Sequence, residues 1–298
     1  MVTGIDCSKD YFDIAVLKDD KIVFSGRFDN NMEATGPYYF QLAKFIVQQG
    51  IKVSVLNPLA VRRFAQMRME RAKTDKKDAV LIAQFTAMTK PKEWVLPSEQ
   101  ILQIRNLETY LSGIKERRQI LYNQWHSLTH LGTMTKELEQ EIMDEIEAYD
   151  LKINLKQKQI ANLIDSNYGQ LAKNLLSIPG IGPRSTALLI TLTERFQGFD
   201  GYRQIISYFG LAPRIYQSGN SVRGRNKICK MGMAQIRKVL YMAATSAIRC
   251  NRACKELYDR LRAKGKPYKV AMIAVVNKLI KQIFTIAKSG KPYKVQLL

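Results

Sequence analysis

Four carboxylates stand at the ends of short predicted elements in the first third of the sequence. Asp6 closes a predicted strand in GID, Glu33 precedes a helix in NMEATG, and Asp75 and Asp78 are three residues apart in AKTDKKDA. Positions i and i+3 lie on one face of a helix. Carboxylates brought together repel one another unless cations share the site, and oxygen-rich clusters suit Mg²⁺. Each acid alone is typical of a cap or a solvated turn, but together with the DNA-binding features further along the chain they predict a Mg²⁺ site for phosphoryl transfer.

Two serines, Ser218 and Ser221, lie in LAPRIYQSGNSVRGRNKICKMG (211–232), a segment without helical periodicity that we expect to be a loop. Two interpretations stay open. The hydroxyls donate hydrogen bonds to a bound phosphate, or one serine attacks a phosphodiester while nearby guanidinium groups stabilise the developing charge. The cationic residues that we expect to contact nucleic acid here are Arg214, Arg223, Arg225, Lys227 and Lys230.

A third motif, IPGIG followed by an apolar helix (178–190), is typical of a helix-hairpin-helix. Gly180 and Gly182 would let the backbone approach a phosphate, and the next helix, which begins near Arg184, would offer free N–H groups to it. The alternative is a simple turn between two helices with a proline in the first helical turn.

The remaining chemistry-bearing residues exclude other classes of site. Both histidines, His126 and His130, fall in a predicted helix far from any acidic partner, which disfavours a Ser-His-Asp triad. Cys250 and Cys254 are one helical turn apart without further ligands at finger spacing, so we expect no zinc site there. Low cysteine content predicts a cytoplasmic protein, and the longest apolar runs are too short to predict a membrane span.

The charge distribution points to a polyanionic partner. The formal net charge is +21, and residues 201–298 carry 21 lysines and arginines against 2 acidic residues. An asymmetry of this size is typical of proteins that bind DNA or RNA.

Periodicity and turn residues predict three regions within an α/β plus α architecture. Strands are expected at 2–6, 11–17 and 21–28, with a tight turn at Asp19 and Asp20 between the last two. A helix that ends at Gly50 and a strand at KVSVLNP (52–58) should follow. We then expect a basic amphipathic helix at 58–70 and a helix capped by Thr74. Alternation of strands and helices favours an α/β layer. Residues from 98 to about 168 predict a helical hairpin or coiled coil, interrupted at LGTMT (131–135).

Seven motifs in order make the sequence resemble the insertion-sequence one-ten family of DEDD transposases. These are RNA-guided serine recombinases that use a bridge RNA, and their relatives include pilin-gene invertases. The motifs run through most of the chain: GID (4–6), MEATGPYYF (32–40), VSVLNPLAVRRFAQ (53–66), AKTDKKDA (72–79), LLSIPGIGPRSTALL (175–189), YFGLAPRIYQSGNSVRGR (208–225) and RKVLYMAATSA (237–247).

The resemblance implies three domains and a mechanism. Residues 1–96 would form a RuvC-like domain of ribonuclease-H fold, 97–170 a coiled-coil arm, and 171–298 a mostly helical transposase domain. By resemblance, the Mg²⁺-binding acids are Asp6, Glu33, Asp75 and Asp78, and Ser218 is the nucleophile that forms a phosphoserine link to DNA. The partners would be donor and target DNA, a structured guide RNA, and further copies of the chain, as homodimers that assemble into a homotetramer.

The sequence departs from the family at one place. Between KIVFSGRF and MEATG the family has a helix and most of a strand, whereas here only Asp29, Asn30 and Asn31 intervene. Two alternatives therefore stay open beside a recombinase. One is a metal-dependent junction-resolving nuclease in which the serine takes no part, and the other is a DNA- or RNA-binding protein whose acid cluster no longer catalyses.

Overall fold

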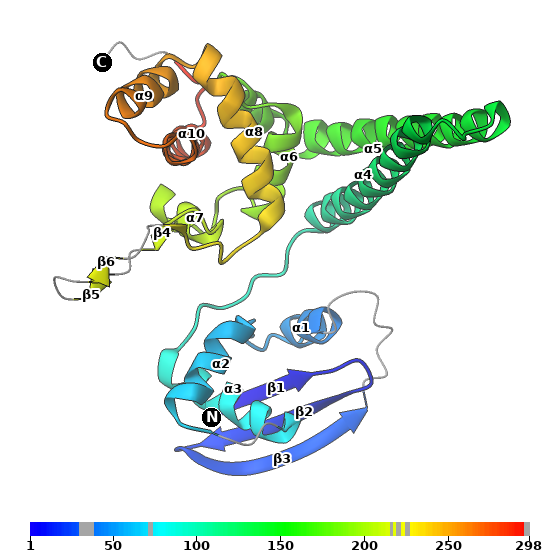
Figure 1. Cartoon of the computed structure of the whole chain (residues 1–298). Helices are drawn as coiled ribbons and strands as arrows, with labels where there is room; N and C mark the ends of the chain where they lie inside the picture. The colour runs from blue at the N-terminus through cyan, green and yellow to red at the C-terminus, as the bar shows by residue number, and fades with distance from the viewer. Residues whose placement is uncertain (30–38, 71–73, 215–216, 219–221, 224–226, 295–298) are drawn as a thin grey trace. The chain divides into compact units, whose positions relative to one another are not determined.

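A computed structural model describes residues 1–29, 39–70, 74–214, 217–218, 222–223 and 227–294. The chain divides into two compact units, Met1–Leu96 and Pro97–Leu298. Helices make up most of the described residues (Figure 1).

The first unit is built on a three-stranded antiparallel sheet in the order β1-β2-β3. Its elements are β1 (Val2–Cys7), β2 (Tyr11–Lys18), β3 (Lys21–Asp29), α1 (Tyr39–Gln48), α2 (Pro58–Met67) and α3 (Asp75–Thr89). Asp19 and Asp20 both adopt positive φ, 48° and 61°, between β2 and β3. Two left-handed residues are what a tight hairpin turn of this kind requires, so the turn predicted there is confirmed.

One face of this sheet is covered by α3, as Figure 1 shows. The packing is close because Gly4 leaves room for the backbone of α3 at Ala79 and Ala83. Small residues dominate this inner layer: Ala15, Ala79 and Ala83 are fully buried. The close approach brings the first turn of α3 up to the carboxyl end of β1.

The strand predicted at KVSVLNP is wrong, and with it the predicted alternation of strands and helices. Residues 51–57 have no strand assignment. The carbonyl of Val53 accepts a hydrogen bond from the N–H of Trp94 at 2.7 Å, which is a single contact rather than a ladder. Asn57 caps α2, and Pro58 is the first residue of that helix instead of the end of a strand.

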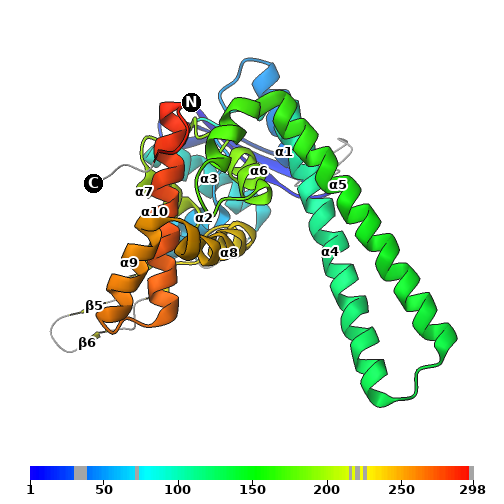
Figure 2. The ribbon, with the colours of Figure 1, turned by 90° about the horizontal axis from the view of Figure 1, so that it is seen from above.

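The second unit begins with a long helical hairpin. Helix α4 (Glu99–Leu131) ends at Gly132, which has a φ of 65°, and α5 (Lys136–Leu176) returns beside it, as Figure 2 shows. The helix break therefore falls at the predicted LGTMT segment. Tyr168 has only a local kink with φ −139° and ψ 20°, and the helix continues to Leu176, just before the IPGIG segment.

The rest of the second unit packs around one hydrophobic core. Its elements are α6 (Pro183–Leu192), α7 (Tyr202–Tyr208), β4 (Pro213–Arg214), β5 (Gln217–Ser218), β6 (Val222–Arg223), β7 (Lys227–Ile228), α8 (Ala234–Cys250), α9 (Arg252–Ala263) and α10 (Tyr268–Ser289). By length and composition α10 could cross a membrane. However, one face of it, which includes Met272, Val276 and Ile283, is fully buried in this core.

Candidate functional site

Three of the four predicted acids meet at the edge of the first unit's sheet. Asp6 comes from the end of β1, and Asp75 and Asp78 come from the first turn of α3. Each offers a carboxylate oxygen, and these oxygens lie within 4.8 Å of one another. All three residues are half-buried. The fourth predicted acid, Glu33, lies outside the described residues.

Thr74 caps α3 and thereby sets Asp75 as the first residue of the helix. Thr74 has extended backbone angles, and its hydroxyl oxygen accepts a hydrogen bond from the N–H of Lys77 at 3.3 Å. The N-terminus of a helix carries a partial positive charge that stabilises nearby carboxylates. The cap therefore fixes Asp75 and Asp78 on the first turn and offsets part of their mutual repulsion.

The set of donor atoms suits a hard divalent cation. All the ligand atoms are carboxylate oxygens, which Mg²⁺ prefers. Burial, and to a lesser extent the charge of Asp6, raises the pKa of the thiol of Cys7, the next residue along β1, to about 11. The thiolate that would bind a softer metal is therefore scarce at neutral pH.

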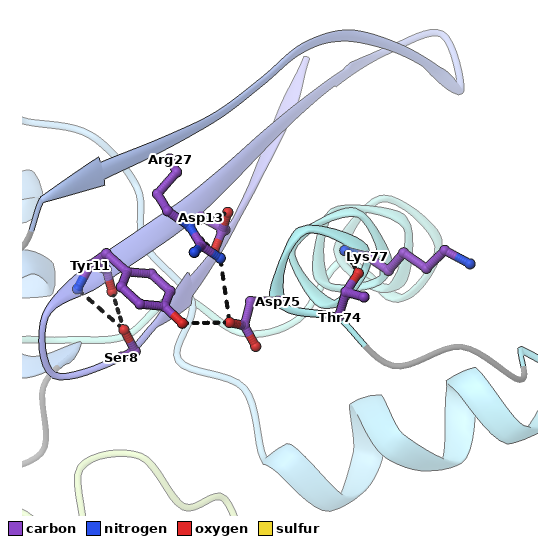
Figure 3. Close-up of polar contacts among 7 residues, drawn as sticks. All are labelled: Ser8, Tyr11, Asp13, Arg27, Thr74, Asp75 and Lys77. Carbon is purple, nitrogen blue, oxygen red and sulfur yellow. Dashed lines mark hydrogen bonds and ion pairs between the residues drawn. The ribbon is translucent and has the colours of Figure 1, made fainter.

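Asp75 is held by two side chains from the sheet. The Tyr11 hydroxyl donates a hydrogen bond to Asp75 Oδ2 at 2.8 Å, and Arg27 Nη2 approaches the same oxygen at 3.4 Å (Figure 3). Arg27 also pairs with Asp13, with Nη2 at 2.8 Å from Oδ2. These contacts raise the pKa of Tyr11, chiefly through the bond to Asp75, and the pKa of Arg27, chiefly through the bond to Asp13.

Sequence reasoning missed Tyr11, Asp13 and Arg27. One signal was available: Asp13 occupies a position of β2 whose neighbours on the same face, Ala15 and Leu17, are buried. A charged residue at an inward position needs a partner. The partner is Arg27, which lies directly opposite Asp13 in the strand register.

The cluster opens onto a cleft of about 1680 Å³ in the first unit. Asp6, Asp75 and Asp78 line the cleft together with parts of β1, α1, α2 and residues 51–56. Arg62 and Lys90 also line it, whereas Lys52 is paired with Glu93 at 2.6 Å. The acids are thus reachable by a polyanionic substrate.

The predicted loop around Ser218 contains a β-hairpin in the second unit, so the prediction of a plain loop is wrong. Strand β4 pairs with β7, and β5 pairs with β6. Ser218 lies opposite Val222, with three residues between them that include Gly219 and Asn220. Ser221 and Arg225 lie outside the described residues.

The hairpin carries like charges in register. Arg214 on β4 lies directly opposite Lys227 on β7, and both side chains are exposed. Like charges at such a pair destabilise a sheet unless an anion lies near them. The backbone of Lys230 fixes the base of the hairpin through its N–H bond to the carbonyl of Gly210 at 3.0 Å. Arg223 belongs to β6.

The glycines of the IPGIG motif lie in the turn between α5 and α6. Gly180 has a φ of 98°, and a side chain there would overlap Ala247 of α8, so packing already requires this glycine. Gly182 caps α6 without a side-chain hydrogen bond, Pro183 is the first helical residue, and Arg184 is exposed. The N-terminus of α6 thus has no side-chain cap of its own.

Two family models match the chain. Residues 31–131 match a DEDD transposase domain of IS110 type, and residues 172–259 match the Transposase IS116/IS110/IS902 family. A pilin gene-inverting protein of Moraxella lacunata is 29% identical over 268 residues, which are 88% of this chain and 80% of the relative. A protein of insertion element IS110 from Streptomyces coelicolor is 28% identical over 139 residues, 47% of this chain and 34% of the relative.

The matches to both family models and to these relatives define the class of protein: the chain is a transposase, an enzyme that recombines DNA. It belongs to the IS110 family of insertion-sequence transposases. The DEDD domain match implies a RuvC-like first unit with a divalent-metal site.

Proposed function

We propose that this transposase cuts and rejoins DNA through a Mg²⁺-dependent acid cluster and a serine nucleophile, guided by a structured RNA. The observation that carries the proposal is the convergence of Asp6, Asp75 and Asp78 from two elements that are far apart in the sequence. Bound Mg²⁺ would neutralise charge on the attacking and leaving oxygens of a phosphodiester. Glu33 is the proposed fourth ligand.

The length of the chain is compatible with that role for Glu33. Asp29 ends β3 opposite Tyr11, the residue whose hydroxyl contacts Asp75. Four residues span up to about 14 Å when extended. Asp29 therefore lies at the end of the sheet where the cluster lies, which supports the proposed role of Glu33 four residues later.

Ser218 is the proposed nucleophile. Its Oγ would form a bond to phosphorus, the bond from phosphorus to a deoxyribose oxygen would break, and the serine proton would pass to solvent or to the leaving oxygen. No oxidation or reduction is involved. Rejoining reverses this step with a hydroxyl of the second DNA, which releases the serine.

The basic hairpin and the N-terminus of α6 are the proposed nucleic-acid contacts. Arg214, Lys227 and Lys230 would neutralise phosphates beside Ser218, together with Arg223 and Arg225. Gly182 and Arg184 would present the uncapped N–H groups of α6 to a phosphate, with Gly180 fixing the turn. Contacts of this kind carry little sequence information, which is compatible with an RNA that selects the target.

The assembly and setting complete the proposal. Acid cluster and serine belong to different units, so they could act in composite sites between subunits, as homodimers that pair into a homotetramer on donor and target DNA. The enzyme would work in the bacterial cytoplasm, at the nucleoid.

A nicked DNA substrate with its guide RNA and Mg²⁺ tests the proposal. The wild-type chain should form a protein-DNA adduct that survives denaturation, Ser218→Ala should form none, and Ser221→Ala should retain it. Free cleaved ends without adducts would instead favour a junction-resolving nuclease. Binding without any cleavage, insensitive to Asp75→Asn, would favour a nucleic-acid-binding protein that no longer catalyses.

A further inference from the structure

One carboxylate oxygen of Asp75 is already engaged by side chains of the sheet. Oδ2 accepts the Tyr11 hydroxyl at 2.8 Å and lies 3.4 Å from Arg27 Nη2. Among the described residues, no donor contacts its other oxygen, Oδ1, at hydrogen-bonding distance. A carboxylate held through one oxygen cannot rotate freely, so the other oxygen keeps a fixed direction.

Arg27 is itself fixed by the sheet on two sides. Its Nε lies 3.3 Å and 3.2 Å from the two carboxylate oxygens of Asp13, and its Nη2 lies 2.8 Å from Oδ2. Its guanidinium carbon lies 3.8 Å above the centre of the Tyr11 ring. Asp13 is only 4% exposed, so this ion pair is shielded from water on the carboxylate side. Planar stacking and fork-shaped pairing are properties of arginine that lysine lacks.

The three side chains also share one place in the sheet. Tyr11 and Asp13 are two residues apart on β2, and Arg27 is the cross-strand partner of Asp13 on β3. Side chains two apart on a strand point to the same face. That face is covered by α3, which carries Asp75. The sheet therefore holds the helix through Asp75 at the point where the helix contributes its acids.

We propose that Tyr11, Asp13 and Arg27 form a clamp that positions Asp75 for divalent-cation binding. Asp13 orients Arg27, and Arg27 and Tyr11 together hold Asp75 Oδ2, leaving Oδ1 for the cation. The guanidinium also provides the positive charge that keeps the acids close before a cation binds. The clamp rests on the proposed function, in which Asp75 is a metal ligand. Tyr11, Asp13 and Arg27 are positioning residues and touch neither DNA nor cation.

Binding of the metal alone distinguishes positioning from a general structural role. Side chains that orient metal ligands typically change metal affinity or activity by about 10- to 100-fold when they are lost. Tyr11→Phe removes one hydroxyl and keeps the ring under Arg27. It should raise the Mg²⁺ or Mn²⁺ concentration for half-maximal thermal stabilisation by ~10-fold or more. Its melting temperature without metal should stay near that of the wild type.

The experiment uses the full chain without DNA and titrates Mg²⁺ or Mn²⁺ while thermal unfolding is followed. Arg27→Lys keeps the charge but loses the fork and the stacking, so its metal midpoint should rise as well. Lys21→Gln is the control, since Lys21 lies at the other end of β3. DNA cleavage should recover in Tyr11→Phe at high Mg²⁺, which a folding defect would not allow.

Two outcomes separate failure of the clamp from failure of the metal site. If Asp75→Asn loses the response to metal while Tyr11→Phe and Arg27→Lys keep the wild-type midpoint, the clamp is wrong and the acid cluster stands. If Asp75→Asn responds to metal as the wild type does, Asp75 is not a ligand, and both proposals are overturned. Should Arg27→Lys fail to fold, Tyr11→Phe alone decides.

Discussion

Gly4 in β1 packs directly against the backbone of Ala79 in α3. A Cβ atom at Gly4 would lie closer to the Ala79 carbonyl oxygen than real carbon atoms ever approach. The contact sets the distance between β1, which carries Asp6, and α3, which carries Asp75 and Asp78. A residue without functional groups thus determines whether the acids meet.

Gly4→Ala should therefore lower stability and weaken metal binding together. Forcing an extra carbon into a close-packed contact costs about 1–3 kcal/mol of unfolding free energy. Urea denaturation measures the loss, and metal titration followed by thermal unfolding measures the second effect.

Gly113→Ala is the matched control for that substitution. Gly113 lies inside α4, and a Cβ there meets nothing within 4 Å. Alanine in a helix interior is favoured over glycine by about 1 kcal/mol. Equal destabilisation by the two substitutions would contradict the close packing of β1 on α3.

Asp75→Asn and Asp78→Asn should each abolish the stabilisation by Mg²⁺ and reduce DNA cleavage. The loss should exceed the roughly 10- to 100-fold change typical of residues that only orient a ligand. Asp20→Asn serves as the control, because Asp20 lies in the β2–β3 turn, where asparagine accepts the left-handed backbone. If both variants were still stabilised by metal as the wild type is, Asp75 and Asp78 would not be metal ligands.

Glu108 predicts a pH dependence of stability in the second unit. Burial raises its pKa above the usual 4.5, although Arg184 and Lys115 counteract part of the shift. The folded chain then keeps this proton to higher pH than the unfolded chain does. The unfolding free energy should fall as pH rises from about 4.5 through the folded pKa.

Thermal unfolding of the wild type and Glu108→Gln between pH 4 and 7 tests this. The glutamine cannot ionise, so the difference in stability between the two chains should shift in favour of the variant as pH rises. Parallel pH profiles would show that Glu108 has the same pKa in the folded and unfolded chain.

Arg214 and Lys227 should contribute to the affinity for DNA or RNA in a way that depends on salt concentration and not on nucleotide sequence. Arg214→Gln removes one side of the like-charged pair on the hairpin. DNA or RNA affinity should fall uniformly across sequences, and the slope of log affinity against log salt should decrease by about 1. Lys136→Gln, at the start of α5, serves as a control that changes the same charge. An unchanged slope in Arg214→Gln would place the phosphates elsewhere.

Local chemistry made parts of the fold predictable. Asp19 and Asp20 tolerate a left-handed turn, Thr74 caps a helix, and Gly132 ends one. Each of these features depends only on the residue type at that position. The strand predicted near residues 51–57 does not form, because β-branched apolar residues favour a strand only where a partner strand offers hydrogen bonds. The kink at Tyr168 has no comparable sequence signal.

The site was predictable only as far as its ligands. Aspartates at the ends of predicted elements could be grouped by residue type, and three of them do meet. The residues that position these aspartates could not be found from residue type and predicted elements. Tyr11 and Asp75 are 64 positions apart, and their contact depends on α3 covering a particular face of the sheet.

Mapping the DNA adduct by mass spectrometry tests the central claim most directly. Wild-type protein trapped on nicked DNA with Mg²⁺ and guide RNA should yield a peptide in which Ser218 is linked to a nucleotide through a phosphate. Asp75→Asn should yield no such peptide. A modification on Ser221, or cleaved DNA with no modified peptide, would contradict the account.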